Sequence, residues 1–392
     1  MKILWLASWY PSRLDLYNGD FVQRHAQAVS LYQEVDVIHV IKDQRGELTR
    51  DVLVEERRNG RLTEYIIYYH HRWQHLPVVG RFFSEIKFRR LYKKQVRAYL
   101  KKNGRPHLAH VHVCMKAGVV ALWLKRKLKL PYVITEHSTA FLANADTRIA
   151  DAPYYYRLSC RRILQQAKAI TVVSEHLGKA VADFAKGVSY RIIPNVVNTD
   201  LFRPAEKTPS TIFRFVHASG LGYQKNPEAI LAAFALLKER TLHFVLDIFG
   251  PANPQLVRMA KELGLEEVVH FHPEVPQTEL AVFIQNADAL ILFSRFETFG
   301  CVVIEANACG VPVVVSDVPP MREIVTDKFN GLIVQNNEQA LAEALCFFMQ
   351  KKIQFDSTLI TADAEKKYSC QTVGAAFSTF YKSIVLERNM SS

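Results

Sequence analysis

Short apolar runs alternate with longer helix-like segments along almost the whole chain. The runs are rich in β-branched residues and lack strict alternation, as expected of strands that are buried on both faces. This pattern predicts an α/β fold with parallel sheets. The predicted strands are Lys2–Ala7, Val35–Ile41, His107–Val113, Pro131–Thr135, Ala169–Ser174, Ile212–Ala218, Leu242–Phe249, Val268–His272, Ala289–Ser294, Val311–Ser316 and Gly331–Val334. The predicted helices are Gly19–Leu31, Ile86–Lys102, Tyr154–Gln166, Pro227–Lys238, Pro254–Leu263, Gln277–Asn286, Phe299–Cys309 and Glu338–Gln350.

The alternation occurs twice, on either side of Pro194–Thr211, a segment rich in Pro, Thr and Asn that we interpret as a linker. A chain of 392 residues is also long for one core. We therefore predict two Rossmann-like, doubly wound domains over residues 1–200 and 205–370, and a helix over residues 371–392 that packs back on the first domain. Domains that face each other would share a ligand cleft at the carboxyl ends of their strands. No G-x-G-x-x-G follows the first strand, which argues against a nicotinamide dehydrogenase.

Charge is distributed unevenly between the two halves. Residues 1–200 hold 33 Lys and Arg against 17 Asp and Glu, whereas residues 201–392 hold 17 against 21. A basic first half is expected to face something anionic.

No apolar run approaches the roughly 18–20 residues of a membrane-spanning helix, and we expect a cytoplasmic protein. The six cysteines are scattered without a C-x-x-C pair, so buried reduced thiols are predicted.

The segment FETFGCVVIEANACGVPVVVSD, Phe296–Asp317, predicts a turn, a short helix and a strand. Thr298 is placed to cap the helix. The free amides at the helix start would bind an anion, and a glycine there lets a ligand approach the backbone. These amides belong to Phe299, Gly300 and Cys301.

Two glutamates frame this predicted anion site. Glu297 lies on the turn, and Glu305 lies eight positions later, roughly 9 Å along the helix. Buried carboxylates are costly unless something binds them, and they accept hydrogen bonds well from sugar hydroxyls. A nucleoside diphosphate sugar has the matching order of ribose, two phosphates and sugar. The alternative is a helix-capping Glu and a solvated mid-helix Glu, but the surrounding strand, Phe-Gly pair, apolar helix and GVPVV favour a functional pair.

On these residues the chain resembles glycosyltransferase family 4, whose hallmark is E-x7-E in the form E-x-F-G-x-x-x-x-E-A. Further matching segments are IPNVVNTDLF (Ile193–Phe202), QKNPEAILAAF (Gln224–Phe234), GVPVVVSD and NGLIV (Asn330–Val334). The resemblance implies the two-domain GT-B fold and a retaining, hexosyltransferase-like enzyme. It also implies a UDP- or GDP-sugar donor, a glycan or lipid-linked acceptor, and no cofactor or metal.

The resemblance also assigns roles to residues of the second domain. Glu305 resembles the carboxylate that holds the ribose, and Glu297 the one at the donor sugar. Lys225 resembles the lysine that neutralises the diphosphate, although an exposed lysine at a helix entry is the alternative. The family usually carries an Arg five positions before this lysine, where this chain has Gly220. One positive charge is therefore missing there or comes from elsewhere.

In the first domain, the resemblance places Gly19 in a glycine loop against the donor phosphate, with an ordinary turn glycine as the alternative. His137, just past a predicted strand end, would contact the donor sugar or stabilise charge there. The catalytic set implied is thus Glu297, His137 and Lys225. His110 and His112 share one face of a strand, where packing is as good an explanation as function. No third ligand is apparent beside them, so no metal site is predicted.

The segment Arg81–Lys102 carries nine basic residues interleaved with aromatic and apolar ones. Such a helix suits an anionic bilayer surface, which predicts attachment to the inner face of the membrane. A solvated helix face is the alternative. No nucleic-acid motif accompanies the segment, so nucleic acid is not expected as a partner. The basic residues are Arg81, Lys87, Arg89, Arg90, Lys93, Lys94, Arg97, Lys101 and Lys102.

The sequence thus predicts a retaining glycosyltransferase of cell-surface polysaccharide or glycolipid synthesis. Two other classes stay open: a nucleotide-sugar epimerase with the same double Rossmann architecture, and a non-catalytic regulator that binds nucleotide sugar. The loop His270–Gln277 is the predicted place of base selection, although it indicates no particular base.

Overall fold

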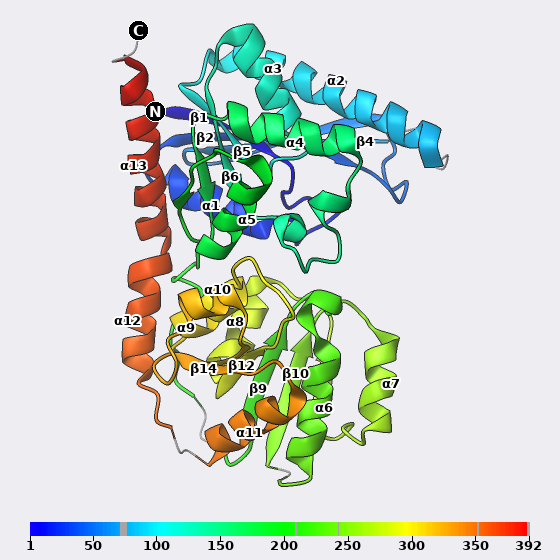
Figure 1. Cartoon of the computed structure of the whole chain (residues 1–392), viewed down its shortest axis with the longest axis vertical. Coiled ribbons are helices and arrows are strands. Elements are labelled where there is room, and N and C mark those ends of the chain that lie inside the picture. The colour runs from blue at the N-terminus through cyan, green and yellow to red at the C-terminus, as the bar shows by residue number, and fades with distance from the viewer. Residues whose placement is uncertain (71–76, 208–209, 242, 351–352, 390–392) are drawn as a thin grey trace.

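The chain folds into two α/β domains, with a helical segment that runs along the side of both (Figure 1). The computed structural model describes residues 1–70, 77–207, 210–241, 243–350 and 353–389. Parts of four predicted features lie outside this description: residues 208–209 of the linker, Leu242 of a strand, residues 390–392 of the C-terminal helix, and the side chain of Arg81.

The first domain contains an eight-stranded sheet in the order β3-β4-β2-β1-β5-β6-β7-β8. Its strands are β1 (Lys2–Ala7), β2 (Glu34–Lys42), β3 (Val52–Asn59), β4 (Leu62–Tyr69), β5 (Leu108–His112), β6 (Tyr132–Glu136), β7 (Ile170–Val172) and β8 (Arg191–Ile192). Its helices are α1 (Asp20–Ser30), α2 (Pro77–Asn103), α3 (Gly118–Leu128), η1 (Thr139–Phe141), η2 (Ile149–Asp151), α4 (Tyr154–Gln166) and α5 (Glu175–Ala185).

The second domain contains a six-stranded parallel sheet in the order β11-β10-β9-β12-β13-β14. Its strands are β9 (Phe213–Ala218), β10 (Phe244–Phe249), β11 (Val269–His272), β12 (Ala289–Leu292), β13 (Val313–Ser316) and β14 (Gly331–Val334). Its helices are η3 (Tyr223–Lys225), α6 (Pro227–Lys238), α7 (Pro254–Glu262), α8 (Gln277–Asn286), α9 (Cys301–Ala308), α10 (Pro319–Ile324) and α11 (Glu338–Met349).

Both sheets are doubly wound, which confirms the predicted fold class. The second sheet has the 3-2-1-4-5-6 order of a Rossmann domain, and the first follows the same order from β4 to β7. The central strands β1, β5, β12 and β13 are almost wholly buried, as their continuous apolar runs predicted. The order reverses between β1 and β5 and between β9 and β12, so a crevice opens at these two points.

The structure contains elements that the sequence prediction lacks, namely β3, β4, β8, α3, α5, α10 and α12 (Ser357–Tyr368), and one predicted cap is wrong. Strand β3 pairs antiparallel with β4, and its charged, exposed residues gave no strand signal. Helix α3 is apolar over most of its surface, so its period was not visible. The predicted cap at Thr298 is wrong, because α9 begins two residues later, with Gly300 at its N-cap and no capping side chain.

The last two helices, α12 (Ser357–Tyr368) and α13 (Cys370–Asn389), connect the domains along one side (Figure 1). Helix α12 packs on α9 of the second domain, and α13 packs on α1 of the first. Gly374 makes a close crossing with α1, because a Cβ atom there would lie 2.2 Å from the carbonyl oxygen of Ala28. The C-terminal segment thus braces α1 and α9, the two helices that face each other across the crevice.

Candidate donor-binding site

A cavity of about 540 Å³ lies between the two domains. The first domain contributes the segment after β1, the first turns of α1 and the segment after β6. The second domain contributes the segments after β9, β10, β11 and β12, together with the start of α9. The cavity therefore occupies the carboxyl ends of both sheets at their switch points, where α/β sheets bind ligands.

Nearly all residues that the sequence singled out meet at this cavity. Its lining includes His137, Gly220, Lys225, Glu297, Phe299, Gly300, Cys301 and Glu305. Gly19 is not part of the lining. It forms the N-cap of α1 with a φ of 75°, and a Cβ atom there would lie 2.5 Å from the carbonyl carbon of Trp9. This geometry explains the glycine through the backbone alone, and contact with a donor phosphate stays a prediction.

The Glu297 carboxylate is held by donors on three sides. Lys225 forms an ion pair with Oε1, which also accepts a hydrogen bond from Ser294 Oγ at 2.8 Å. Gln224 Nε2 donates to Oε2 at 3.1 Å. Asn226, in the left-handed conformation, ends η3, and Pro227 starts α6 directly after it. This junction holds Lys225 at the edge of the sheet, where its side chain reaches Glu297. Glu297 therefore orients Lys225 and Gln224 at the cavity wall.

The amino end of α9 opens into the same cavity. Gly300, Cys301 and Val302 line it, and the first amides of a helix have no partner within the helix. Gly300 has a φ of 104°, and a Cβ atom there would come within 2.8 Å of Met321 Cε. Only glycine fits this turn without strain, and the result is an amide cluster suited to an anion.

Glu305 faces the first domain and forms an ion pair with Arg24 of α1. Arg24 also bonds Asp20, at 2.9 Å. Burial raises the pKa of Glu305, although Arg24 pulls it down. Burial alone would lower the pKa of Arg24, but the carboxylates of Asp20 and Glu305 raise it above its ordinary value, so the guanidinium stays charged.

His137 follows β6 and is 5% exposed, at the cavity edge. Its backbone N–H donates to Glu136 Oε1 at 2.9 Å, and its ring lies 4.7 Å from that of Phe21. Burial lowers the pKa of His137 well below its ordinary value, so the imidazole is neutral near pH 7. It also lies beside His25 and His112.

Sequence reasoning missed Arg24 and Gln224. Arg24 lies on an amphipathic helix with an acidic residue four positions before it, which is common on exposed helices and gave no signal of a buried site.

The position of Gly220 is open to the cavity, since a Cβ atom there would meet nothing within 4 Å among the described atoms. Arg24 and Lys225 are the lining residues with cationic side chains.

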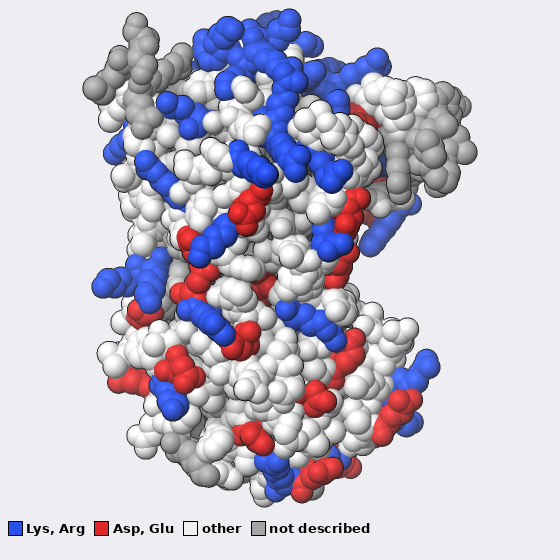
Figure 2. Space-filling model, in the orientation of Figure 1, with Lys and Arg blue, Asp and Glu red and all other residues white. Residues whose placement is uncertain are grey.

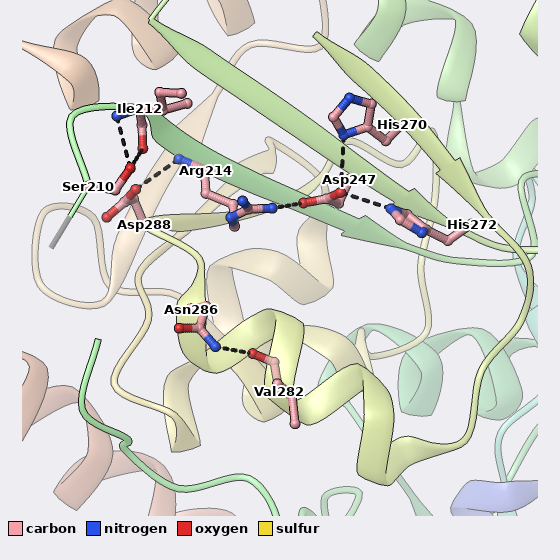
Figure 3. Close-up of polar contacts among 9 residues, drawn as sticks. All are labelled: Ser210, Ile212, Arg214, Asp247, His270, His272, Val282, Asn286 and Asp288. Carbon is pink, nitrogen blue, oxygen red and sulfur yellow. Dashed lines mark hydrogen bonds and ion pairs between the residues drawn. The ribbon is translucent and has the colours of Figure 1, made fainter. Parts of the chain in front are cut away.

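Part of the predicted base-selection loop reaches the cavity. Glu274, Val275 and Gln277 line it. His270 and His272 instead turn toward Asp247 of β10, with Nε2 of His272 at 2.8 Å and Nδ1 of His270 at 3.6 Å from Oδ1 (Figure 3). Selection of the base by this loop stays a prediction.

Basic side chains gather on the first domain, whereas both signs mix on the second (Figure 2). Helix α2 buries Phe88, Tyr92, Val96 and Tyr99 against the sheet, which leaves its basic residues on the outer side. Phe82 is 63% exposed. Within the described parts of the chain, no helix combines the length and apolar character needed to cross a bilayer.

Both domains match known protein families in sequence. Residues 198–363 match the family described as glycosyl transferases group 1, and residues 48–201 match glycosyltransferase family 4. D-inositol 3-phosphate glycosyltransferase of Arthrobacter sp. (strain FB24) is 27% identical over 260 residues, 61% of each chain. Alpha-monoglucosyldiacylglycerol synthase of Streptococcus pneumoniae is 23% identical over 338 residues, 81% of this chain and 76% of that protein.

Solved structures agree in fold. Sucrose-phosphate synthase from Thermosynechococcus elongatus superposes with a TM-score of 0.78 at 19% identity, over 99% of this chain and 100% of the other. Anabaena HepE in complex with UDP gives a TM-score of 0.72 at 18% identity, over 98% and 100%. The match to the first curated relatives spans about three fifths of their length, 61% for the Arthrobacter protein. The two family matches together cover residues 48–363, and the chain belongs to the glycosyltransferases of family 4, group 1.

Proposed function

We propose that the protein transfers a sugar, with retention of configuration, from a UDP- or GDP-sugar to a glycan or lipid-linked acceptor. The observation that carries this proposal is the Lys225–Glu297 ion pair beside the amino end of α9, inside the interdomain cavity. A cation and free amides together suit a diphosphate, and the carboxylates on either side suit sugar hydroxyls.

Each group has a role in the departure of the nucleoside diphosphate. Lys225 and the first amides of α9 neutralise the charge that develops on the leaving phosphate. Glu305 binds the ribose, and Arg24 supplies the second positive charge that the chain lacks at Gly220. Glu297 already accepts hydrogen bonds from Ser294 and Gln224 as well as the ion pair, which favours a positioning role over a nucleophilic one. No metal is proposed at the diphosphate.

His137 would face the donor sugar from the first domain. Its buried, neutral imidazole offers a hydrogen bond without adding charge. Closure of the two domains over the donor would exclude water and suppress hydrolysis of the activated sugar. The hydrogen bonds from Ser174 Oγ to the Thr298 carbonyl oxygen, at 2.6 Å, and from Gln277 to Asp20, at 3.1 Å, support a closable contact of this kind.

We further propose a lipid-linked acceptor at the inner face of the membrane. Helix α2 offers exposed basic residues beside exposed Phe82, a combination suited to an anionic bilayer. The Streptococcus relative is named as a glycolipid synthase, which favours the same class of acceptor.

A donor panel tests the proposal directly. Thermal shifts with UDP-, GDP- and ADP-sugars should single out one donor, since a ligand at a hundredfold over its Kd adds about 2.7 kcal/mol of stability. That donor should release nucleoside diphosphate when membrane lipid extract is present, and NMR should show the retained anomer in the product. A changed sugar without an acceptor would identify an epimerase. Donor binding without any release would identify a regulator.

A further inference from the structure

Three buried histidines from separate elements meet beside the cavity, which one of them, His137, lines. His25 lies on α1, His112 ends β5 and His137 follows β6. One ring nitrogen of each lies within 4.8 Å of those of the other two. The sequence offered only the pair His110 and His112, without a third ligand. The fold supplies the further ligands, because β6 lies beside β5 and α1 brings the His25 ring to 5.5 Å from that of His137.

The hydrogen bonds of His25 fix its tautomer. Its Nε2 lies 3.0 Å from the carbonyl oxygen of Pro194, which can only accept, so Nε2 carries the proton. A neutral imidazole with its proton on Nε2 has no second proton to donate. The Nδ1 atom of His25 therefore carries a free lone pair, and this atom has no hydrogen-bond partner among the described residues.

The other two rings also keep an unused nitrogen. His112 Nε2 and His137 Nδ1 are buried without a partner in the described chain. A buried ring nitrogen without a partner is uncommon, and the unpartnered Nδ1 belongs to His25, whose ring lies beside those of His112 and His137. By contrast, both nitrogens of neighbouring His110 are bonded, to Tyr381 at 2.6 Å and Thr135 at 2.7 Å.

This arrangement matches the way proteins hold transition metals. A ligating His is typically neutral and donates its other N–H to a backbone carbonyl, as His25 does to Pro194. Tetrahedral Zn–N bonds of about 2.0–2.1 Å separate neighbouring nitrogens by roughly 3.3 Å. His112 Nδ1 and His137 Nε2 lie 3.4 Å apart. Trp5 stacks on His112 with ring centroids 3.9 Å apart and holds that ring in place.

We propose that His25, His112 and His137 form a binding site for one divalent transition-metal ion of the zinc class. His137 lines the cavity, so an ion has a route from the cleft and an exchangeable ligand can complete the coordination. The site departs from the expectation of a metal-free protein. The site shares His137 with the proposed contact to the donor sugar, but metal binding can be measured without sugar transfer, and the diphosphate retains its own partners in Lys225 and the α9 amides.

The second domain contains a group of residues that resembles a metal site by residue type but does not suit a cation. His270 and His272 share Asp247, also a plausible ligand set by residue type (Figure 3). Here, however, Arg214 Nη1 lies 2.6 Å from Asp247 Oδ2, so a permanent positive charge already compensates the carboxylate. A cation at that place would meet electrostatic repulsion, which makes His272 a matched control.

The test is metal binding by the purified full chain after removal of metal with a chelator. Zn²⁺ titration against a competing chromophoric chelator should show about one tight site per chain, and Co²⁺ should give the visible bands of nitrogen ligation. His25→Gln, His112→Gln and His137→Gln should each weaken binding by at least about 100-fold. His272→Gln and His39→Gln should leave it unchanged. Loss of binding in His272→Gln, or wild-type affinity in all three cluster variants, would overturn the site.

A measurement on the wild-type chain covers the case of variants that do not fold. Crystals soaked in Zn²⁺ should give an anomalous difference peak between the three imidazoles at the zinc edge. An empty cluster in crystals with the metal bound elsewhere, or with none bound, would reject the proposal regardless of the variants.

Discussion

Arg24 Nη1 donates to Glu305 Oε1 at 2.5 Å, a contact that joins helix α1 of one domain to α9 of the other. The two side chains are 7% and 6% exposed. The carboxylate predicted to bind the ribose therefore also ties the domains together. Donor binding and domain closure would then act on the same pair of residues.

Removal of Arg24 should destabilise the fold strongly. Arg24→Met leaves the Glu305 carboxylate buried without its cation, which costs about 3–5 kcal/mol for a buried pair. The double variant Arg24→Met/Glu305→Gln should recover part of that loss, because the unpaired charge is gone. Urea unfolding of Arg24→Met, Glu305→Gln and the double variant measures the three free energies of unfolding. The exposed pair Arg322–Asp317 is the control, and Arg322→Met should shift the midpoint far less. Additive effects of the two buried substitutions would contradict the coupling.

Lys225→Gln should depress turnover as well as donor affinity. We expect kcat to fall by about 10²–10³, the scale seen when one preorganised donor to a developing charge is removed. Glu305→Ala should mainly raise the donor KM, since the ribose does not change during transfer. Steady-state assays of nucleoside diphosphate release separate the two effects. Lys238→Gln, at the far end of α6, is the control and should keep wild-type kinetics. Turnover that survives the loss of Lys225 would remove it from the catalytic set.

Gly220→Arg should strengthen donor binding. The position lines the cavity, and a Cβ atom there has no described neighbour within 4 Å, so the side chain can enter the open space. A second guanidinium near the diphosphate should lower the donor KM several-fold, equivalent to about 1 kcal/mol for a charge-assisted contact. The control Gly220→Ala removes the glycine without adding a charge, and the donor KM should change little. If Gly220→Arg leaves the donor KM unchanged or raises it, a further cation at this position does not reach the diphosphate.

The predictable part of the site was local in sequence. Glu297, Phe299, Gly300 and Glu305 lie within one strand–turn–helix unit, so spacing alone brought them to one sheet edge. Thr298 is not the cap because α9 starts after Gly300, which takes the left-handed conformation at the N-cap, and the Thr298 carbonyl oxygen accepts a hydrogen bond from Ser174 of the other domain. Single-sequence patterns contain no information on such a contact.

The rest of the site depends on long-range contacts. Arg24 and Glu305 are 281 positions apart, and they meet because the two domains pack face to face. The three clustered histidines come together through the order of β1, β5 and β6 in the sheet. Strand β3 was missed because an exposed edge strand tolerates charge, which hides the apolar run of a buried strand.

Acid should destabilise the second domain through His217. Burial, with a smaller effect of Lys225, lowers the pKa of His217 to about 4 in the fold, against about 6.5 unfolded. Between those values the unfolded chain binds the proton and the folded chain does not. Its contribution, up to about 3 kcal/mol, is therefore present above pH 6.5 and is lost as the pH falls toward 4. Urea midpoints between pH 7.5 and 5 should fall less steeply in His217→Gln than in the wild-type chain. Equal slopes would contradict a neutral buried His217.

Membrane attachment should depend on the outer side of α2. Arg90, Lys94 and Lys101 are exposed, whereas Lys87 donates to the His70 carbonyl oxygen and Arg89 pairs with Glu85. The triple change of the three exposed residues to Gln should cut binding to vesicles rich in phosphatidylserine by roughly 100-fold, at about 1 kcal/mol each. The control replaces Arg240, Arg258 and Lys261, three exposed basic residues of the second domain.

Co-sedimentation at rising salt concentration completes this test, because attraction to a charged surface weakens as the Debye length shortens. The wild-type chain should leave the vesicles as salt rises and should bind neutral vesicles poorly throughout. The control triple variant has the same net charge as the α2 variant, so a difference between them locates the contact on α2 and excludes a general effect of charge. Equal retention of the two variants would show that α2 is a solvated face and that the acceptor reaches the cleft by another route.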